Sequence, residues 1–489
     1  MSLINSNEIS YMVEHNLIND VAIRFGIIGA GQKGNKDADI FAGYTFSNGS
    51  RCYPTLAVNF AKNDMLHLKN IPDKDRIHFD GFKGAARTPS LVVESFDEQY
   101  NPDAPKMIDQ LSTAMEQTFM SNGELIIDHL IITAGSGGGF GTGFISLCIK
   151  LMQESYFPVP VTFLLSNPAE DHQEKLNAIV LGSEINDFQK LQNELYKNNE
   201  IDYKPLGSII MTDNRRMMEI YNRKKHEGNF VSWKNAGNDE IVSTIHEMNI
   251  IPASFGSDNV TYDPSDFSKL LQESGSFISF HKTVVESPFA FEVIEENMKS
   301  SIDRGIFAAD HNYDTANNVG FFVLRPGYAE TFKDIQTEQT IMKTINDYNE
   351  TAERKYGDPI WNNSYAVIYL GFSGMTLPNV LSRLNEEYMA NEEKRKALIE
   401  RDTEKEINFS NAIDSVKSNN FNPYRKQQQA KGFKSTGFSS SGSAFSRKET
   451  KVEDNKVPET KAAPKTFGSR SNAPGVKSTS ESPWSKLKK

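Results

Sequence analysis

The sequence predicts an α/β fold built on a parallel β-sheet. Short apolar stretches alternate with helical patterns through the first half of the chain, and glycine-rich loops follow two of these stretches. Strands that are apolar along their whole length are typical of a parallel sheet covered by helices on both faces. Ligands of such Rossmann-like sheets bind beyond the carboxyl ends of the strands, where the glycine loops lie.

The individual elements can be placed along the chain. Strands are expected at Val21–Gly29, Thr55–Phe60, His129–Ala134, Pro160–Ser166 and Leu206–Thr212, and later at Asn318–Pro326 and Tyr365–Phe372. The predicted organisation is a first domain over residues 1–234, a long central helix over 235–257, a smaller α/β C-terminal domain over 258–383, a charged helix over 384–407 and a disordered tail over 408–489.

Charge and composition separate the tail from the rest of the chain. The chain of 489 residues has a net charge of −11, yet residues 411–489 contain 16 Lys and Arg against 6 Asp and Glu. The tail is rich in Ser, Gly, Pro and Lys, so it cannot bury enough apolar surface to order itself, and its charge suggests a partner of its own. Two cysteines, no signal-peptide pattern and no long apolar run predict a cytoplasmic protein without stable membrane insertion.

The densest glycine loop predicts a phosphate-binding site. Residues 134–143 read "AGSGGGFGTG" and lie between a predicted strand and an apolar helix. Glycine lets backbone N–H groups converge on an anion, and a helix that begins after the loop adds its own N–H groups and positive dipole end. The hydroxyl of Thr142 can donate to a phosphate oxygen. A plain glycine hinge is the alternative, but hinges are not normally set between a buried strand and a buried helix.

A second glycine loop follows the first strand and raises a rival interpretation. "GIIGAGQKGN" (Gly26–Asn35) contains the GxGxxG spacing of nicotinamide and flavin dinucleotide sites, which would make the protein a Rossmann NAD-dependent oxidoreductase. That site needs an acidic residue at the end of the second strand, where this chain has Asn59 and Phe60. Two glycine loops at neighbouring strand ends favour one nucleotide with several phosphates.

The loops together resemble those of the tubulin and FtsZ superfamily of filament-forming GTPases. "TAGSGGGFGTGF" is similar to its GGGTGTG signature, with Phe140 in place of Thr, and "LAVNFAKND" is similar to its second loop, with Phe60 and Ala61 in place of Thr-Asp. "GAARTP" (Gly84–Pro89) resembles the loop that senses the terminal phosphate, and "NPAEDHQEKLNA" resembles the ribose loop. "MTDNRR" stands where the superfamily has Asn-Asp-Lys/Arg, with the acid and the amide exchanged, and "NAGND" resembles the start of its central helix. The resemblance implies a GTPase domain that binds GTP or GDP with Mg²⁺.

The resemblance also implies a set of nucleotide-binding residues. Asn35 and Asp239 would contact guanine, and Glu170, or Asp171 after a one-residue gap, would contact the ribose. The full set is Gly31, Gln32, Asn35, Asn59, Gly84, Ala85, Gly137, Gly138, Gly139, Phe140, Gly141, Thr142, Gly143, Glu170, Asp213, Asn214 and Asp239.

Two carboxylates after the central helix are the candidate catalytic residues. Asp263 and Asp266 stand three apart in "NVTYDPSDFSKLL", a spacing that on its own favours a helix N-cap with Pro264 at the first helical position. The position also matches the superfamily's NxDxxD loop, with Thr261 departing from Asn. That resemblance implies that the loop reaches the nucleotide of the next subunit, with Asp266, and second Asp263, positioning the attacking water.

The C-terminal part suggests a branch of the superfamily. A charged helix followed by a basic tail resembles the plasmid-segregating TubZ branch, and the sequence ends "SPWSKLKK", without the apolar peptide of division-ring proteins. The resemblance implies a longitudinal homopolymer and contact of the tail, residues 408–489, with a TubR-like DNA-binding adaptor on centromeric plasmid DNA. A phage-encoded tubulin-like protein that positions phage DNA is the alternative, and direct DNA binding by the tail remains open.

Overall fold

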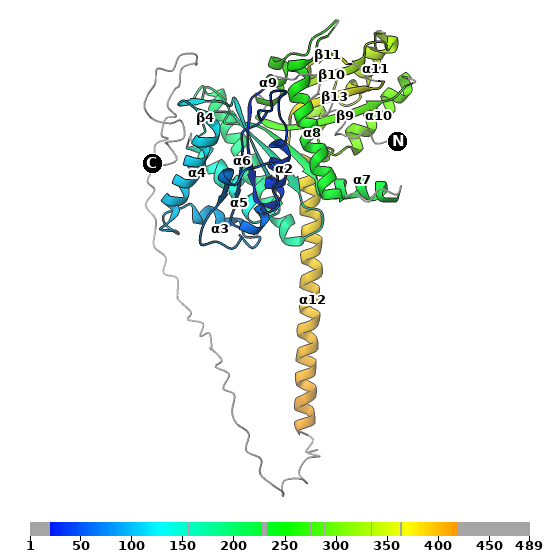
Figure 1. The fold of residues 1–489 in the computed structure, drawn as a ribbon. Coiled ribbons are helices and arrows are strands. Elements are labelled where there is room, and N and C mark those ends of the chain that lie inside the picture. The colour runs from blue at the N-terminus through cyan, green and yellow to red at the C-terminus, as the bar shows by residue number, and fades with distance from the viewer. Residues whose placement is uncertain are drawn as a thin grey trace. The chain divides into compact units, whose positions relative to one another are not determined.

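The structure is a computed structural model that describes residues 20–154, 157–226, 232–257, 259–272, 275–287, 289–333, 335–361 and 364–418. Figure 1 shows a sheet flanked by helices. The described residues up to Met389 belong to one compact unit, and the described residues 390–418 belong to a second. Among the described residues, no helix combines the length and the apolar character needed to cross a membrane.

One large sheet runs through the first unit. Its strands are β1 (Phe25–Ala30), β2 (Thr55–Asn59), β3 (Arg76–His78), β6 (His129–Gly135), β7 (Val161–Asn167), β8 (Leu206–Asp213), β9 (Ser276–Val285), β10 (Asn318–Pro326), β11 (Glu353–Gly357), β12 (Ile360–Trp361) and β13 (Ala366–Met375). Their order is β11-β10-β13-β9-β8-β7-β6-β1-β2-β3, with β12 beside β10. A separate antiparallel pair consists of β4 (Met120–Ser121) and β5 (Glu124–Leu125).

The half of the sheet from β3 to β8 has the predicted Rossmann-like arrangement. Every pair in it is parallel, and its six strands lie in the doubly wound order 3-2-1-4-5-6. The order reverses between β1 and β6, so the loops that leave these two strands diverge and open a crevice. The predicted α/β parallel-sheet fold is confirmed. Among the named strands of the large sheet, the antiparallel pairs are those of β13 with β9 and with β10.

Helices cover both faces of the sheet. They are α2 (Gly31–Phe41), α3 (Pro89–Ser95), α4 (Ala104–Phe119), α5 (Phe140–Gln153), α6 (His172–Lys197), α7 (Asn214–His226), α8 (Trp233–Ser254), α9 (Pro264–Gln272), α10 (Phe291–Arg304), α11 (Ile335–Asn346) and α12 (Asn379–Ser418). Short 3₁₀ turns occur at η1 (Lys62–Met65), η2 (Asp73–Asp75), η3 (Tyr313–Thr315) and η4 (Glu330–Lys333).

Alternate side chains of the central strands enter two separate cores. Ile28 packs in the core beneath α3, α4, α5 and α6, whereas its neighbour Ile27 packs in the core beneath α2, α7, α8 and α9. Both side chains are almost fully buried. This two-sided burial explains why the strands are apolar at every position instead of at every second one.

The long helix α8 is the element that the sequence predicts at 235–257. It runs from Trp233 to Ser254 and is buried on nearly all sides from Ile241 to Ile251. Its buried Glu247 is paired with Lys282 Nζ of β9 at 2.7 Å and accepts a hydrogen bond from the Tyr369 hydroxyl of β13 at 2.8 Å. A buried carboxylate needs such partners, so this contact fixes α8 against the antiparallel part of the sheet.

Helix α12 contains the charged segment predicted at 384–407. It begins earlier, at Asn379, and continues through Ser418, so the tail boundary predicted at residue 408 falls inside a helix. The remainder of the predicted basic tail, residues 419–489, lies outside the described residues.

Candidate nucleotide-binding pocket

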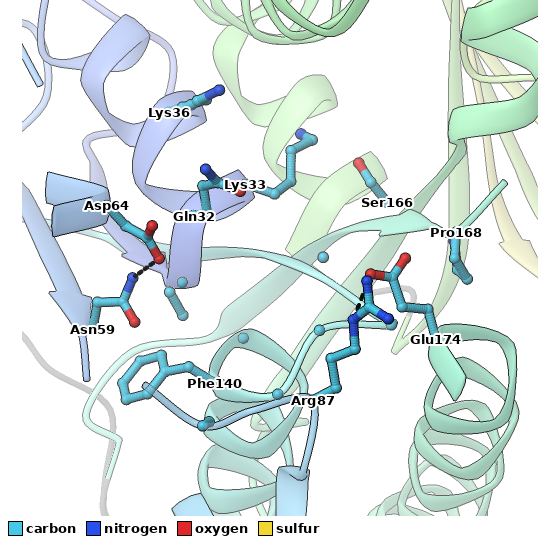
Figure 2. Close-up of a pocket in the computed structure, with 18 of the residues that line it drawn as sticks. Gln32, Lys33, Lys36, Asn59, Asp64, Arg87, Phe140, Ser166, Pro168 and Glu174 are labelled. Carbon is cyan, nitrogen blue, oxygen red and sulfur yellow. Dashed lines mark hydrogen bonds and ion pairs between the residues drawn. The ribbon is translucent and has the colours of Figure 1, made fainter. Parts of the chain in front are cut away.

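A pocket of about 430 Å³ lies beyond the carboxyl ends of β1, β2, β6, β7 and β8. Figure 2 shows side chains from several loops converging on it, with Gln32 and Asn59 on one side and Arg87 and Glu174 on the other. This is the crevice that a reversal of strand order creates in a doubly wound sheet. The size and position suit a nucleotide.

Two glycines make the phosphate side of the pocket possible. Gly31, the first residue of α2, has a φ of +71°, a conformation that favours glycine. Gly139 precedes the first turn of α5, and a Cβ there would lie 2.8 Å from the Arg87 nitrogen and 2.9 Å from the Ala85 Cβ. The loop of Gly84–Pro89 therefore closes directly onto the glycine loop, and Phe140 and Gly141 in the first turn of α5 line the pocket. The N–H groups of a first helical turn are suited to bind an anion.

Arg87 is held in the pocket wall by acidic partners and by its backbone. Its guanidinium lies 2.7 Å from Asp171 Oδ2 and 3.6 Å from Glu174 Oε1. Arg87 and Ala86 both have positive φ angles, 60° and 45°, which cost energy in residues other than glycine. The Asn177 side chain donates to the Arg87 and Gly137 carbonyls at 3.0 and 2.9 Å, so one buried amide joins the two phosphate-side loops.

Lysines add positive charge to the opposite side of the pocket. Lys33 and Lys36 of α2 and Lys234 of α8 line it. Lys33 forms an ion pair with the fully buried Asp37, whose Oδ2 also accepts from the Thr133 hydroxyl at 2.6 Å. Charged donors around a glycine-rich loop are the chemistry that a polyphosphate requires.

Phe60 and Phe140, the two aromatic residues that differ from the superfamily loops, contact each other. The rings of Phe60 and Phe140 lie 4.7 Å apart edge to face, and Phe60 stacks on Phe82 at 4.0 Å. Phe140 is buried, with 5% of its surface exposed. Aromatic packing thus stands at two positions where the resemblance implies polar side chains, and it joins the glycine loop, through Phe140, to the end of β2.

Most of the predicted nucleotide-binding residues line this pocket. Those that do are Gly31, Gln32, Asn59, Gly84, Ala85, Gly137, Gly138, Gly139, Phe140, Gly141 and Asn214. They come from five different loops, so the folded chain brings together segments that the sequence analysis could connect only by resemblance.

Three predicted residues next to the pocket are engaged inside the protein instead. Asn35 is fully buried and pairs with the backbone of Val58 on β2. The Thr142 hydroxyl donates to the Gly135 carbonyl at 3.3 Å, and Gly143 packs against Pro89 and Val92 of α3. The side chains of Asn35 and Thr142 and the closely packed backbone at Gly143 therefore join the loops to the fold, whereas a direct contact with a nucleotide stays a prediction.

Three predicted residues on the base and ribose side also lie outside the pocket lining. Asp213 is buried and ion-paired with Arg383. Glu170 is exposed in the loop before α6, and its alternative Asp171 caps α6 by accepting from the Glu174 N–H at 3.0 Å. Asp239 lies on an exposed face of α8, and its neighbour Asn238 lines the pocket.

Several residues that line the pocket have no individual role predicted from the sequence. They are Ala30, Lys33, Lys36, Ala61, Asp64, Ala86, Arg87, Gly135, Ser166, Pro168, Glu174, Trp233, Lys234 and Asn238. Lys33 stands inside the second glycine loop and Arg87 inside the Gly84–Pro89 loop, and a cation within a candidate phosphate loop is a usable signal for anion binding. Glu174 and Trp233 gave no comparable signal, because only the paths of α6 and α8 bring them to the pocket.

The candidate catalytic carboxylates form a capping structure at the start of α9. Asp263 Oδ1 accepts from the Ser265 N–H at 2.8 Å, the Ser265 hydroxyl at 2.6 Å and the Asp266 N–H at 3.1 Å. Asp266 Oδ2 accepts in return from the Asp263 N–H at 3.3 Å, which is the reciprocal pattern of a capping box. The hydrogen bonds from the Ser265 hydroxyl and the Asp266 N–H lower the pKa of Asp263. Neighbouring residues of the turn therefore fix the conformation of Asp263 and favour its charged form.

This acidic turn lies at the opposite edge of the sheet from the pocket. Ser268 and Gln272 of α9 border a hollow together with Ile23, which precedes β1, and Pro160, which precedes β7. These residues mark the amino ends of the parallel strands, whereas the pocket lies beyond their carboxyl ends. Within one chain, Asp263 and Asp266 therefore stand far from the pocket.

Fold and site together define a tubulin-like nucleotide-binding protein. Solved structures of low identity share the fold: CetZ1 from Haloferax volcanii superposes with a TM-score of 0.55 at 20% identity, over 76% of this chain and all of that one. The family described as "Tubulin/FtsZ-like protein TubZ-like, C-terminal domain" matches residues 247–385.

Relatives of higher identity specify the family. The tubulin-like protein TubZ of Bacillus thuringiensis subsp. israelensis is 47% identical over 438 residues, which cover 87% of this chain and 90% of the relative. Its GTPγS-form protofilament superposes with a TM-score of 0.77 over 81% of this chain and 99% of that one, at 47% identity. A two-stranded TubZ-Bt filament matches equally well, over 88% and 100%. The chain belongs to the TubZ family of tubulin-like proteins, and the oxidoreductase interpretation is wrong.

Proposed function

We propose that this chain binds GTP in the pocket at the carboxyl edge of its sheet, assembles head to tail and hydrolyses GTP where two subunits meet. The protein is a tubulin-like GTPase of a polymer-forming family. The observation that supports the proposal best is the separation of its two charged regions. A pocket suited to a triphosphate occupies one edge of the sheet, and an acidic turn occupies the other.

Head-to-tail stacking would bring the two regions together. In such a stack, the acidic turn of one subunit faces the pocket of the next, so Asp266 can orient a water molecule for attack on the terminal phosphate. Asp263 is more strongly engaged, because one of its oxygens accepts three hydrogen bonds in the cap. Asp266 is therefore the proposed water-positioning residue and Asp263 the residue that fixes the turn.

The bound nucleotide would bring Mg²⁺ with it. Among the described residues no group of three or more His, Cys, Asp or Glu side chains could hold a metal ion. Mg²⁺ is usually bound through one or two carboxylates together with substrate phosphates and water, so a dedicated cage is not required. Of the two pocket carboxylates, Glu174 is paired with Arg87, which leaves Asp64 beside Asn59 as the candidate ligand.

The biological role that we propose is plasmid segregation. A TubZ structure described as a type III plasmid segregation protein is 45% identical and matches 81% of this chain and 99% of its own. The basic tail, residues 408–489, would contact a TubR-like adaptor bound to centromeric DNA, because scattered Lys and Arg attract a phosphate-rich surface. Such contact should weaken steeply as salt is raised.

Assembly and tail binding can be tested separately. Light scattering should rise when GTP is added and not when NAD is added, and electron microscopy should show filaments that persist longer with a slowly hydrolysed GTP analogue. Pull-down of plasmid centromere DNA should require both the adaptor and residues 408–489. A protein that ignores GTP refutes the first part of the proposal, and DNA capture that does not depend on the tail refutes the second.

A further inference from the structure

The first turns of α12 contact two segments that form walls of the nucleotide pocket. Arg383 forms an ion pair with Asp213 at the end of β8, and its other terminal nitrogen lies 3.0 Å from Asp310 Oδ2. Asp213 has only 3% of its side chain exposed, so its carboxylate depends on Arg383 for a counter-charge. Arg383 thereby fixes the junction between β8 and α7.

Glu387 stands one helical turn further along and forms a second bridge. It pairs with Lys175 of α6, whose side chain is 6% exposed, and with Arg215 Nη1 of α7 at 2.6 Å. Tyr388 adds a ring stack on His172 at the start of α6, with centroids 4.4 Å apart. Residues four apart lie on the same face of a helix, so a single face of α12 contacts both α6 and α7.

The partners of this face are direct neighbours of pocket residues. Asp213 and Arg215 flank Asn214, which lines the pocket, and Lys175 follows Glu174, which lines it from the other wall. Glu174 in turn holds Arg87. The pocket walls at Glu174 and Asn214 are 40 residues apart in the sequence, and both are thus held by the first turns of α12.

The charges of the two bridging residues agree with this geometry. Burial opposes the charged form of each, yet Asp213 raises the pKa of Arg383, and Lys175 and Arg215 lower the pKa of Glu387. Both groups are therefore ionised at neutral pH, as the bridges require.

We propose that Arg383 and Glu387 are positioning residues of the pocket, so that nucleotide binding and the attachment of α12 are energetically coupled. This proposal depends on the proposed function, since it assumes that the pocket binds a guanine nucleotide. Coupling between two sites is reciprocal, so a partner that displaces the start of α12 would release nucleotide, and bound nucleotide would strengthen the attachment of α12.

The test measures affinity for a fluorescent GDP analogue in the full-length protein. Arg383→Gln and Glu387→Gln should each weaken binding by about tenfold, the effect of losing one charge-assisted contact. The control is Arg395→Gln on the same helix, whose only described ion pair is with Glu392 at 3.6 Å on the surface, and it should change affinity less than about twofold. Arg383→Lys should recover part of the loss.

A purely structural role predicts a different result. If Arg383 only stabilised the fold, Arg383→Gln would lower the melting temperature equally with and without saturating GDP. Coupling predicts a smaller GDP-induced rise in melting temperature in the variants than in the wild type. Equal GDP affinity in wild type and both variants overturns the coupling and leaves the proposed function intact, whereas a wild type that does not bind GDP overturns both.

Discussion

The pocket and the acidic turn differ in how much of the chain builds them. The pocket collects residues from the segments after six strands and from the start of α8, and these residues line a common space. The acidic turn consists of four consecutive residues, Asp263–Asp266, and its polar groups form hydrogen bonds with one another. For the pocket, the geometry of one chain is enough to indicate a binding site. For the acidic turn, helix capping explains every contact, so a catalytic role requires a neighbouring subunit.

The largest effect should come from Asp266→Ala. Because Asp266 is the proposed water-positioning group, GTP turnover in assembled protein should fall by about 100-fold, within the range of general-base contributions. GTP binding and polymerisation should persist, and filaments should live longer. Turnover is measured as phosphate release above the assembly threshold, with Ser265→Ala in the same turn as the control. Normal turnover in Asp266→Ala would reduce the turn to a helix cap.

Next in size is the effect of Gly139→Ala on the pocket. The added Cβ would meet the backbone of Arg87 at 2.8 Å, so one of the two phosphate-side loops must move. Overpacking of this kind costs about 2 kcal/mol, which corresponds to about 30-fold weaker GTP binding. Gly256→Ala is the matched control, since nothing lies within 4 Å of its added Cβ. Equal affinities in a titration with a fluorescent analogue would show that the loops do not need this close approach.

Arg87→Ala should have a smaller effect, also on binding. It removes a cation from the pocket wall and leaves Asp171 and Glu174 without that partner, so nucleotide affinity should fall by about tenfold. The control is Arg24→Ala, which breaks a comparable exposed ion pair between Arg24, just before β1, and Asp128, just before β6. If both variants bind GTP alike, the Arg87 pair is only a surface ion pair.

The smallest effect is expected from substitutions of Asp263, which distinguish its role as a helix cap from the role of its charge. Asp263→Asn keeps a good N-cap, whereas Asp263→Ala loses it and should cost about 1 kcal/mol of unfolding free energy. Both variants should keep most of the turnover that Asp266→Ala loses. Urea denaturation and phosphate release measure the two quantities. A loss of turnover in Asp263→Asn as large as in Asp266→Ala would mean that the charge of Asp263 also takes part in catalysis.

The sequence predicted the architecture well because its signals are local. Continuous apolar strands and glycine loops at strand ends suffice to indicate a two-sided parallel sheet, and β10 matches the predicted Asn318–Pro326 at both ends. Contacts between distant segments had no such signal. Nothing near Thr142 reveals that its hydroxyl turns to the Gly135 carbonyl, and nothing near Phe60 reveals that it meets Phe140.

Long-range pairing also explains the residues that were missed. Asn177 joins two loops because α6 passes behind both, and Arg383 reaches Asp213 because α12 returns to β8 from 170 residues away. These contacts depend on the packing of whole helices. A single sequence shows which residue types are present in a helix, but it does not show which loop that helix will face.

The central claim is tested most directly by GTP turnover per subunit as a function of protein concentration. Since the pocket and Asp266 lie at opposite edges of one chain, unassembled subunits should release almost no phosphate, and the rate should rise linearly above the concentration at which light scattering begins. A turnover per subunit that is the same below and above that concentration would show that each chain hydrolyses GTP alone, and would contradict the account.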